Sequence, residues 1–382
     1  MPTRKITVFP YSSAFAPYTT TWASRLLANS EMEISHIVAP HGYAFHGKDC
    51  GEIDRRGAMG FIVENDFAAA LCDSDVLLLA EGLHTQSLRI DIVQKAVYSA
   101  QIGKDIFCAF RLSAQEETVI RKACDSGHTS FSYVFDLPQV ILPTLNSLPI
   151  RSNELQPISM PIVLVAEVMD NLNGIDMTLA LWDHFLCKGY RSTIIMPAGT
   201  ASFMGAHNIE SFYSNEGDLY QQIRSLNHSV GQLEYQTETD LFIIKVPGNV
   251  MAITDEVSGD FGVNAYLLSQ AIAVDCCLLC VPYGFINKEV LYEYEMLLKY
   301  RYSWPLDGIH MSNAMLDITY IQEMHEMSCA YLSLEKAIQT VIDINNENDT
   351  GVAVFNSLQR PELLCKMIEE KLCNYGVASA IM

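Results

Sequence analysis

The sequence has no long apolar run, which is relevant to whether the protein crosses a membrane. No uninterrupted stretch reaches the ~20 apolar residues that a transmembrane helix needs. The opening Met1–Lys5 leads directly into Ile6–Phe9, which favours a β-strand over a signal peptide. The eleven cysteines are scattered, several of them inside apolar runs, which indicates reduced and buried thiols. We therefore expect a soluble, cytoplasmic protein.

Positive charge is also scarce. The 382 residues include 24 Lys and Arg against 45 Asp and Glu, for a formal net charge of −21. Such a surface repels the phosphates of nucleic acids, so nucleic-acid binding is not expected. It suits a basic partner, although an acidic surface can also serve solubility alone.

Familiar catalytic and metal-binding patterns are missing as well. The sequence has no Ser-His-Asp order, nucleophile elbow or His-Glu-x-x-His pattern, so no residue is assigned a catalytic role. His41, His46 and Cys50 lack a fourth ligand and a zinc spacing. Cys277 and Cys280 have no second pair and lie in an apolar run, as core residues do. We expect no metal site.

What the sequence does contain is a regular alternation of strands and helices, which predicts an α/β protein with two doubly wound, mainly parallel sheets. The first domain, over 1–136, is predicted to be flavodoxin- or Rossmann-like, with strands at 6–9, 34–38, 76–79 and 106–108 and helices at 15–27, 67–71, 88–100 and 114–124. Five prolines between 137 and 161 mark 137–160 as a linker.

The second predicted domain covers 161–382 and opens on the buried strand 161–166. Further strands are expected at 191–196, 240–245, 275–281, 308–312 and 352–355, and helices at 175–188, 264–273, 288–300 and 361–372, with a long helical region after Asp317. Neither an internal repeat nor a low-complexity tract is apparent.

The loop from Glu167 to Gly174 joins a strand to a helix at the length of a phosphate-binding P-loop. In the pattern Gly-x-x-x-x-Gly-Lys-Ser/Thr, the first glycine, the lysine and the hydroxyl are replaced by Met169, Ile175 and Asp176. The strand–loop–helix context remains, and so do the free N–H groups of a helix N-terminus. The cofactor is therefore unknown: a nucleotide with magnesium would be bound weakly or not at all. Residues placed at this site are Asp170, Asn171, Asn173, Gly174, Asp176 and Asn313.

Two further segments strengthen the likeness to P-loop domains. The strand 240–245 followed by Pro247-Gly248 resembles the second acid-bearing strand of dethiobiotin-synthetase and ParA-like domains. The run 309–313 resembles their late strand, which ends in a base-facing asparagine, here Asn313. Together with a preceding flavodoxin-like domain, the order is similar to a bacterial group that includes D-glutamate N-acetyltransferases.

A resemblance over nearly the whole chain rests on the opening strand with Phe9-Pro10-Tyr11, the loop from Pro40 to Gly51 and the degenerate P-loop. Together they resemble the clostridial-type peptide maturation system proteins, which accompany Cys-rich precursor peptides and radical SAM maturases. The resemblance implies a role in making a ribosomal natural-product peptide (RiPP), with the precursor, the maturase or both as partner; a homodimer stays open.

Two charged loops are candidate partner sites. Lys48 and Asp49 lie between two glycines in a loop that follows the second strand, where either a ligand site or a plain surface turn is consistent with the pattern. Asp255, Glu256 and Asp260 follow the strand 240–245, so they are expected on one acidic rim with Glu167, Asp170 and Asp176. Such a rim could hold a divalent metal or a basic peptide segment, unless the carboxylates form only a solvated face.

Two function classes remain open, so enzyme status is left uncertain. One is a binding or accessory protein for peptide maturation, with a P-loop fold that does not hydrolyse nucleotide efficiently. The other is an enzyme, a ligase or acyltransferase, that uses a nucleotide or acyl-CoA donor between its domains. In that case Lys48, Lys245 or Arg191 would replace the missing lysine.

Overall fold

The chain forms two compact units. The computed structural model describes residues 3–82, 85–136, 154–197, 199–212, 218–252, 259–325, 327–347 and 352–378. The first unit comprises 1–141 together with 198–208, and the second comprises 142–197 with 209–382. The sequence-based boundaries assigned 198–208 to the second domain, and the structure places them with the first. Most of the predicted linker, 137–153, lies outside the described residues, whereas 156–160 is hydrogen-bonded to helix α6 (Leu219–Gln236) of the second unit.

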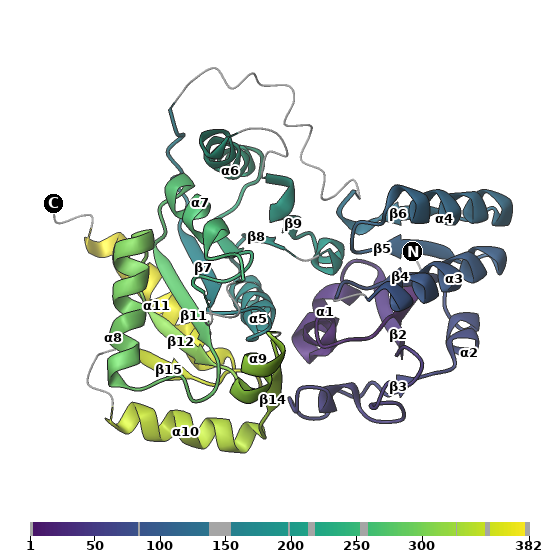
Figure 1. The fold of residues 1–382 in the computed structure, drawn as a ribbon. Coiled ribbons are helices and arrows are strands. Elements are labelled where there is room, and N and C mark those ends of the chain that lie inside the picture. The colour runs from purple at the N-terminus through teal and green to yellow at the C-terminus, as the bar shows by residue number, and fades with distance from the viewer. Residues whose placement is uncertain are drawn as a thin grey trace. The chain divides into compact units, whose positions relative to one another are not determined.

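The first unit contains a six-stranded sheet in the order β3-β2-β1-β4-β5-β6 (Figure 1, purple to blue). All its pairings are parallel. The strands are β1 (Arg4–Phe9), β2 (Met32–Val38), β3 (Val63–Glu64), β4 (Val76–Leu79), β5 (Asp105–Cys108) and β6 (Phe131–Tyr133). Without the two-residue edge strand β3, this is the flavodoxin order. Strands β2 and β3 lie on one side of β1, and β4, β5 and β6 lie on the other. The switch point of the sheet is therefore between β1 and β4.

Helices cover both faces of this sheet. Helices α2 (Phe67–Cys72), α3 (Gln86–Gln101) and α4 (Ala114–Gly127) share one apolar core with the sheet. On this side Phe9 contacts Phe67 edge-on, with ring centroids 5.5 Å apart, and Lys95 lies over both rings. The short helix η1 (Ala16–Thr19) and helix α1 (Thr21–Ala28) follow β1. The predicted helix at 15–27 is thus two elements, divided at Thr20, whose backbone is extended.

The second sheet has seven strands in the order β15-β12-β11-β7-β10-β8-β9, all of which belong to the second unit except the two-residue edge strand β9. Its strands are β7 (Ile162–Glu167), β8 (Ser192–Met196), β9 (His207–Asn208), β10 (Leu241–Lys245), β11 (Cys276–Val281), β12 (Gly308–Met311) and β15 (Ala353–Phe355). The central strands β7, β10 and β11 are buried throughout, as expected for a parallel sheet covered on both faces. The two doubly wound α/β sheets confirm the predicted fold class.

Helix α5 (Gly174–Cys187) packs on β7, β8 and β10, and α11 (Glu362–Ala378) lies beside it. The other helices are α6 (Leu219–Gln236), α7 (Val263–Ala271), α8 (Lys288–Leu297), α9 (Ile318–Met324) and α10 (Leu334–Glu347). The prediction of one long helical region after Asp317 is wrong. Strand β14 (Cys329–Tyr331) separates α9 from α10 and pairs with β13 (Ala314–Leu316). No helix in the described part of the chain has the length and apolar character that a membrane crossing requires.

Candidate functional site: a strand–helix loop filled by its own carboxylate

The loop between β7 and α5 lies at the switch point of the second sheet, because the strands formed after β7 lie on both of its sides. Asn171 and Asn173 both have left-handed backbone conformations, with φ of 66° and 72°. Asparagine tolerates this region better than most residues. The turn at Asn173 directs the backbone N–H groups of Leu172 and Gly174 toward one point, as in an anion-binding nest.

That point is occupied by the carboxylate of Glu167, the last residue of β7. Its Oε1 accepts hydrogen bonds from the backbone N–H groups of Leu172 and Gly174, both at 2.8 Å. Its Oε2 lies 2.7 Å from the ammonium nitrogen of Lys245, the last residue of β10. The side chains of Glu167 and Lys245 are 2% and 5% exposed, so the pair is closed to water. The backbone N–H groups of the loop therefore already bind an internal anion.

Gly174 is required by this arrangement. A Cβ atom at this position would lie 2.5 Å from Cδ of Glu167, closer than side-chain atoms normally approach. The sequence suggested Gly174 as the second glycine of a phosphate loop. In the structure, its lack of a side chain gives space to a carboxylate.

The electrostatics of the loop favour the charged pair. Burial by itself lowers the pKa of Lys245, but the adjacent Glu167 outweighs it, and the net shift is upward. Although Asp170 reaches the surface, the partial burial of its carboxyl group and the charge of Glu167 raise its pKa. Negative charge is therefore already concentrated here, and a nucleotide phosphate would add more.

Behind the loop, a buried polar network joins α5 to β12. Asn173 accepts a hydrogen bond from Oγ of Ser312 at 2.6 Å and lies 3.3 Å from Asp176 and 3.4 Å from Nε2 of His310. Burial lowers the pKa of His310 to about 3, so the ring is neutral at physiological pH. The N–H of Ser357 points at Nδ1, which assigns the proton to Nε2. These contacts fix Asn173 and with it the loop.

The structure brings some of the expected cofactor residues together and separates others. Asn173, Gly174 and Asp176 meet in the buried loop, while Asp170 and Asn171 reach the surface. Asn313 is buried, and its amide donates to the carbonyl of Leu332, before α10. It thus contributes to the connection with β14.

The expected acidic rim is smaller than the sequence suggested. Asp176 is 1% exposed and is therefore closed to a partner. The Asp260 carboxylate accepts hydrogen bonds from the backbone N–H of Gly262 and the side chain of Asn264, both at 3.0 Å, so it holds its own loop. Asp255 and Glu256 lie outside the described residues.

The two charges of the first unit's loop serve different purposes. Lys48 is exposed and lies 3.4 Å from Glu52. The Asp49 carboxylate accepts hydrogen bonds from the backbone N–H groups of Gly51, Met59 and Gly60, at 2.8–2.9 Å. Asp49 therefore closes the loop, and only Lys48 is presented to solvent.

The three cations that the sequence suggested as replacements for a missing phosphate-binding lysine already have acidic partners. Lys245 pairs with Glu167, Lys48 with Glu52, and Arg191 with Glu238 and Asp240. Within the described ranges, no group of three or more His, Cys, Asp or Glu side chains is arranged to hold a metal ion.

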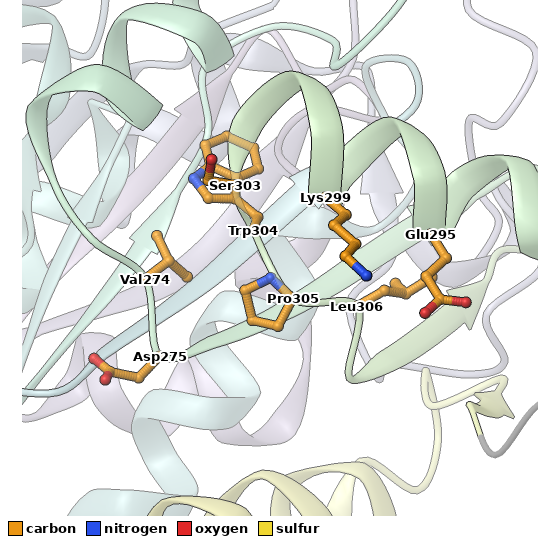
Figure 2. A pocket seen from close by; sticks show the side chains of 8 residues that line it. All are labelled: Val274, Asp275, Glu295, Lys299, Ser303, Trp304, Pro305 and Leu306. Atoms are coloured by element: carbon orange, nitrogen blue, oxygen red, sulfur yellow. The ribbon is translucent and has the colours of Figure 1, made fainter.

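A pocket of about 510 Å³ lies elsewhere in the second unit (Figure 2). Its walls come from the segments that precede β11 and β12, so it lies at the amino ends of these strands, away from the P-loop. The lining residues are Val274, Asp275, Glu295, Lys299, Ser303, Trp304, Pro305 and Leu306. No residue predicted from the sequence as a site residue lines it.

Comparison with known proteins gives a likeness of fold. No family model matches the chain, and no curated protein matches it. Among solved structures, the chain is similar to a DUF1611 family protein from Anabaena variabilis ATCC 29413, with a TM-score of 0.59 and 15% sequence identity. The match covers 96% of this chain and 99% of that one. At this identity, the likeness shows a shared fold.

Proposed function

We propose that this protein is an accessory binding protein in the maturation of a ribosomally made, Cys-rich peptide, and that its P-loop domain does not hydrolyse nucleotide. The observation that supports a non-hydrolysing role is the Glu167 carboxylate in the phosphate position. The resemblance to clostridial-type peptide maturation proteins suggests the pathway. The precursor peptide and the radical SAM maturase are the proposed partners.

A nucleotide would have to overcome two costs at this loop. The β- and γ-phosphates would have to displace Glu167 from its two N–H donors and from Lys245. Breaking a buried ion pair typically costs ~3–5 kcal/mol, because a buried charge is left without its partner. Asp170 would then add repulsion between like charges.

We expect no heat of binding when ATP, GTP or acetyl-CoA is titrated into the protein by calorimetry, with or without magnesium. We also expect no release of phosphate above that of a mock purification. Saturable binding of a nucleotide together with turnover would contradict the non-hydrolysing role. Binding of acetyl-CoA would instead favour the acyltransferase alternative.

Association with the partner is expected to depend on charge. The net charge of −21 favours a basic peptide or protein surface. Attraction of this kind weakens as the Debye length falls from ~10 Å at 0.1 M salt to ~3 Å at 1 M. Capture of the cognate precursor or maturase should therefore be strong at low salt and weak at high salt.

Reversing Asp255 and Glu256 to lysine should slow association more than it speeds dissociation, as expected for steering charges. The matched control reverses Glu33 and Asp125, two exposed acids of the first unit, which changes the net charge equally. Surface plasmon resonance separates the two rates. Equal effects of the two double variants would mean that association depends on the net charge and not on the positions of Asp255 and Glu256.

A further inference from the structure

The pocket of the second unit adjoins a turn of uncommon backbone geometry, and the role proposed above does not use it. Helix α8 continues into a π-helical turn, Leu298–Tyr302, and the chain then passes through Ser303 with a left-handed φ of 57°. Turns of this kind, and left-handed residues other than glycine, are infrequent and are concentrated at functional sites. Lys299 of the turn and Ser303 both line the pocket. The unusual backbone therefore lies where a ligand would be held.

The aromatic part of the pocket wall is held in place from behind. Trp304 is buried, and its ring stacks on that of Tyr302 with centroids 4.7 Å apart. The Tyr302 phenol donates a hydrogen bond to the carbonyl of Val250 at 2.5 Å. The backbone N–H of Trp304 donates to the carbonyl of Leu298 at 3.0 Å. This wall is preformed, so a ligand that packs on it would lose little affinity to the ordering of side chains.

Two opposite charges line the same pocket without neutralising each other. Glu295 and Lys299 lie four residues apart, a spacing at which Glu and Lys on a helix commonly pair. Among the residues that the structure describes, neither forms an ion pair. The Lys299 ammonium lies 5.6 Å from the ring centroid of Tyr300, a contact that leaves its hydrogen-bond donors available. Figure 2 shows both charged side chains directed toward the segment at Leu306, whereas the carboxylate of Asp275 points away.

We propose that this pocket binds a free α-amino acid with an apolar side chain. The ammonium of the ligand lies against Glu295 and its carboxylate against Lys299, where both form charge-assisted hydrogen bonds. Its side chain packs on the wall made by Trp304, Pro305 and Leu306. The volume of about 510 Å³ is in the range of ~300–1,000 Å³ that is usual for small-molecule sites.

The two charges distinguish a free amino acid from the end of a peptide. Only a free amino acid carries an ammonium and a carboxylate on the same carbon atom. The N-terminal residue of a peptide lacks the carboxylate and would leave Lys299 without a partner, and a C-terminal residue lacks the ammonium and would leave Glu295 without one. A charged side chain would lose hydration against the apolar wall without compensation. Leucine, methionine and phenylalanine are ligands of the expected class.

Isothermal titration calorimetry on the full chain tests the proposal with leucine as the probe. We expect saturable binding of leucine, and binding weaker by about tenfold for leucinamide, which lacks the carboxylate, and for N-acetylleucine, which lacks the ammonium. Lys299→Gln should weaken leucine binding about tenfold and abolish the preference for leucine over leucinamide. Glu295→Gln should do the same for the preference over N-acetylleucine. The comparison of the three ligands on the wild type does not depend on the folding of any variant.

Control variants and a spectroscopic signal locate the site. Glu293→Gln removes an exposed acid of the same helix, Lys122→Gln removes an exposed cation of the first unit, and neither should change the affinity for leucine. The chain has three tryptophans, so the indole N–H signal of Trp304 can be assigned with Trp304→Phe in a ¹⁵N NMR spectrum and should shift when leucine is added.

Four results would overturn the proposal. Leucine may fail to bind saturably, or leucinamide or N-acetylleucine may bind as tightly as leucine does. Lys299→Gln and Glu295→Gln may bind leucine as the wild type does. The Trp304 signal may stay in place at saturating leucine.

Discussion

Replacing Glu167 with alanine is expected to lower the free energy of unfolding by about 3–5 kcal/mol. The variant leaves the buried Lys245 without its carboxylate partner. It also removes the acceptor from the N–H groups of Leu172 and Gly174. For a domain of this size, such a loss shifts the melting temperature by about 6–20 °C. Urea unfolding followed by circular dichroism would measure the change.

Two comparisons show whether the charge pair causes the loss. Glu52→Ala removes one partner of an exposed pair, with Lys48 at 3.4 Å, and should cost at most ~1 kcal/mol. Glu167→Leu combined with Lys245→Met replaces the pair by apolar side chains. It should recover the part of the loss that comes from the unpaired charge of Lys245, but not the part that comes from the N–H groups of Leu172 and Gly174. Inorganic phosphate should raise the melting temperature of Glu167→Ala more than that of the wild type, because the N–H groups and Lys245 are then left for an external anion. A loss below 1 kcal/mol in Glu167→Ala would contradict the role given to the pair.

Gly174→Ala is expected to lower the free energy of unfolding when residue 167 is glutamate and to raise it when residue 167 is alanine. In the wild type, the new Cβ would lie 2.5 Å from Cδ of Glu167, and overpacking of this kind typically costs ~1–3 kcal/mol. When Glu167 is already alanine, the obstacle is gone. Alanine in place of glycine then stabilises the start of α5 by up to ~1 kcal/mol, because it restricts the unfolded chain.

A double-mutant cycle in urea measures this coupling directly. Gly174→Ala, Glu167→Ala and the double variant are compared with the wild type. The effect of Gly174→Ala on the free energy of unfolding is thus measured once with Glu167 present and once with alanine in its place. The expected coupling is several kcal/mol and favours the double variant. If Gly174→Ala were equally destabilising in both backgrounds, the glycine would be needed for a reason other than space for the carboxylate.

The fold was largely predictable because its strands are strong local signals. The apolar run 76–79 coincides with β4, and the prediction at 6–9 lies within β1. The missed strands have a different physical basis. β14 has three residues and exists only by pairing with β13, and β3 has two. Helix α6 (Leu219–Gln236) was not predicted, because polar residues and Gly231 obscure its apolar face.

The candidate site was only half predictable, for a similar reason. The strand–loop–helix context around Gly174 is local, and the sequence shows it. The partner of Glu167 is Lys245, on a strand far along the chain, so the sequence around Glu167 does not reveal the pair. The pocket beside Trp304 was missed altogether, because the segments that line it meet only in the folded chain. The available signal was an aromatic residue, Trp304, in the loop just before a predicted strand.

The course of residues 198–208 also determines where the chain can be divided. A fragment ending at 141 would contain every strand of the first sheet, yet it would lack Phe203 and Thr200. It would expose the ring of Phe107, which Phe203 meets edge-on, and leave the Glu81 carboxylate without its two hydrogen bonds from Thr200. A shorter version of the first unit therefore needs 198–208 returned to it, as a fused extension or as a separate peptide. The unit is continuous in space and discontinuous in sequence.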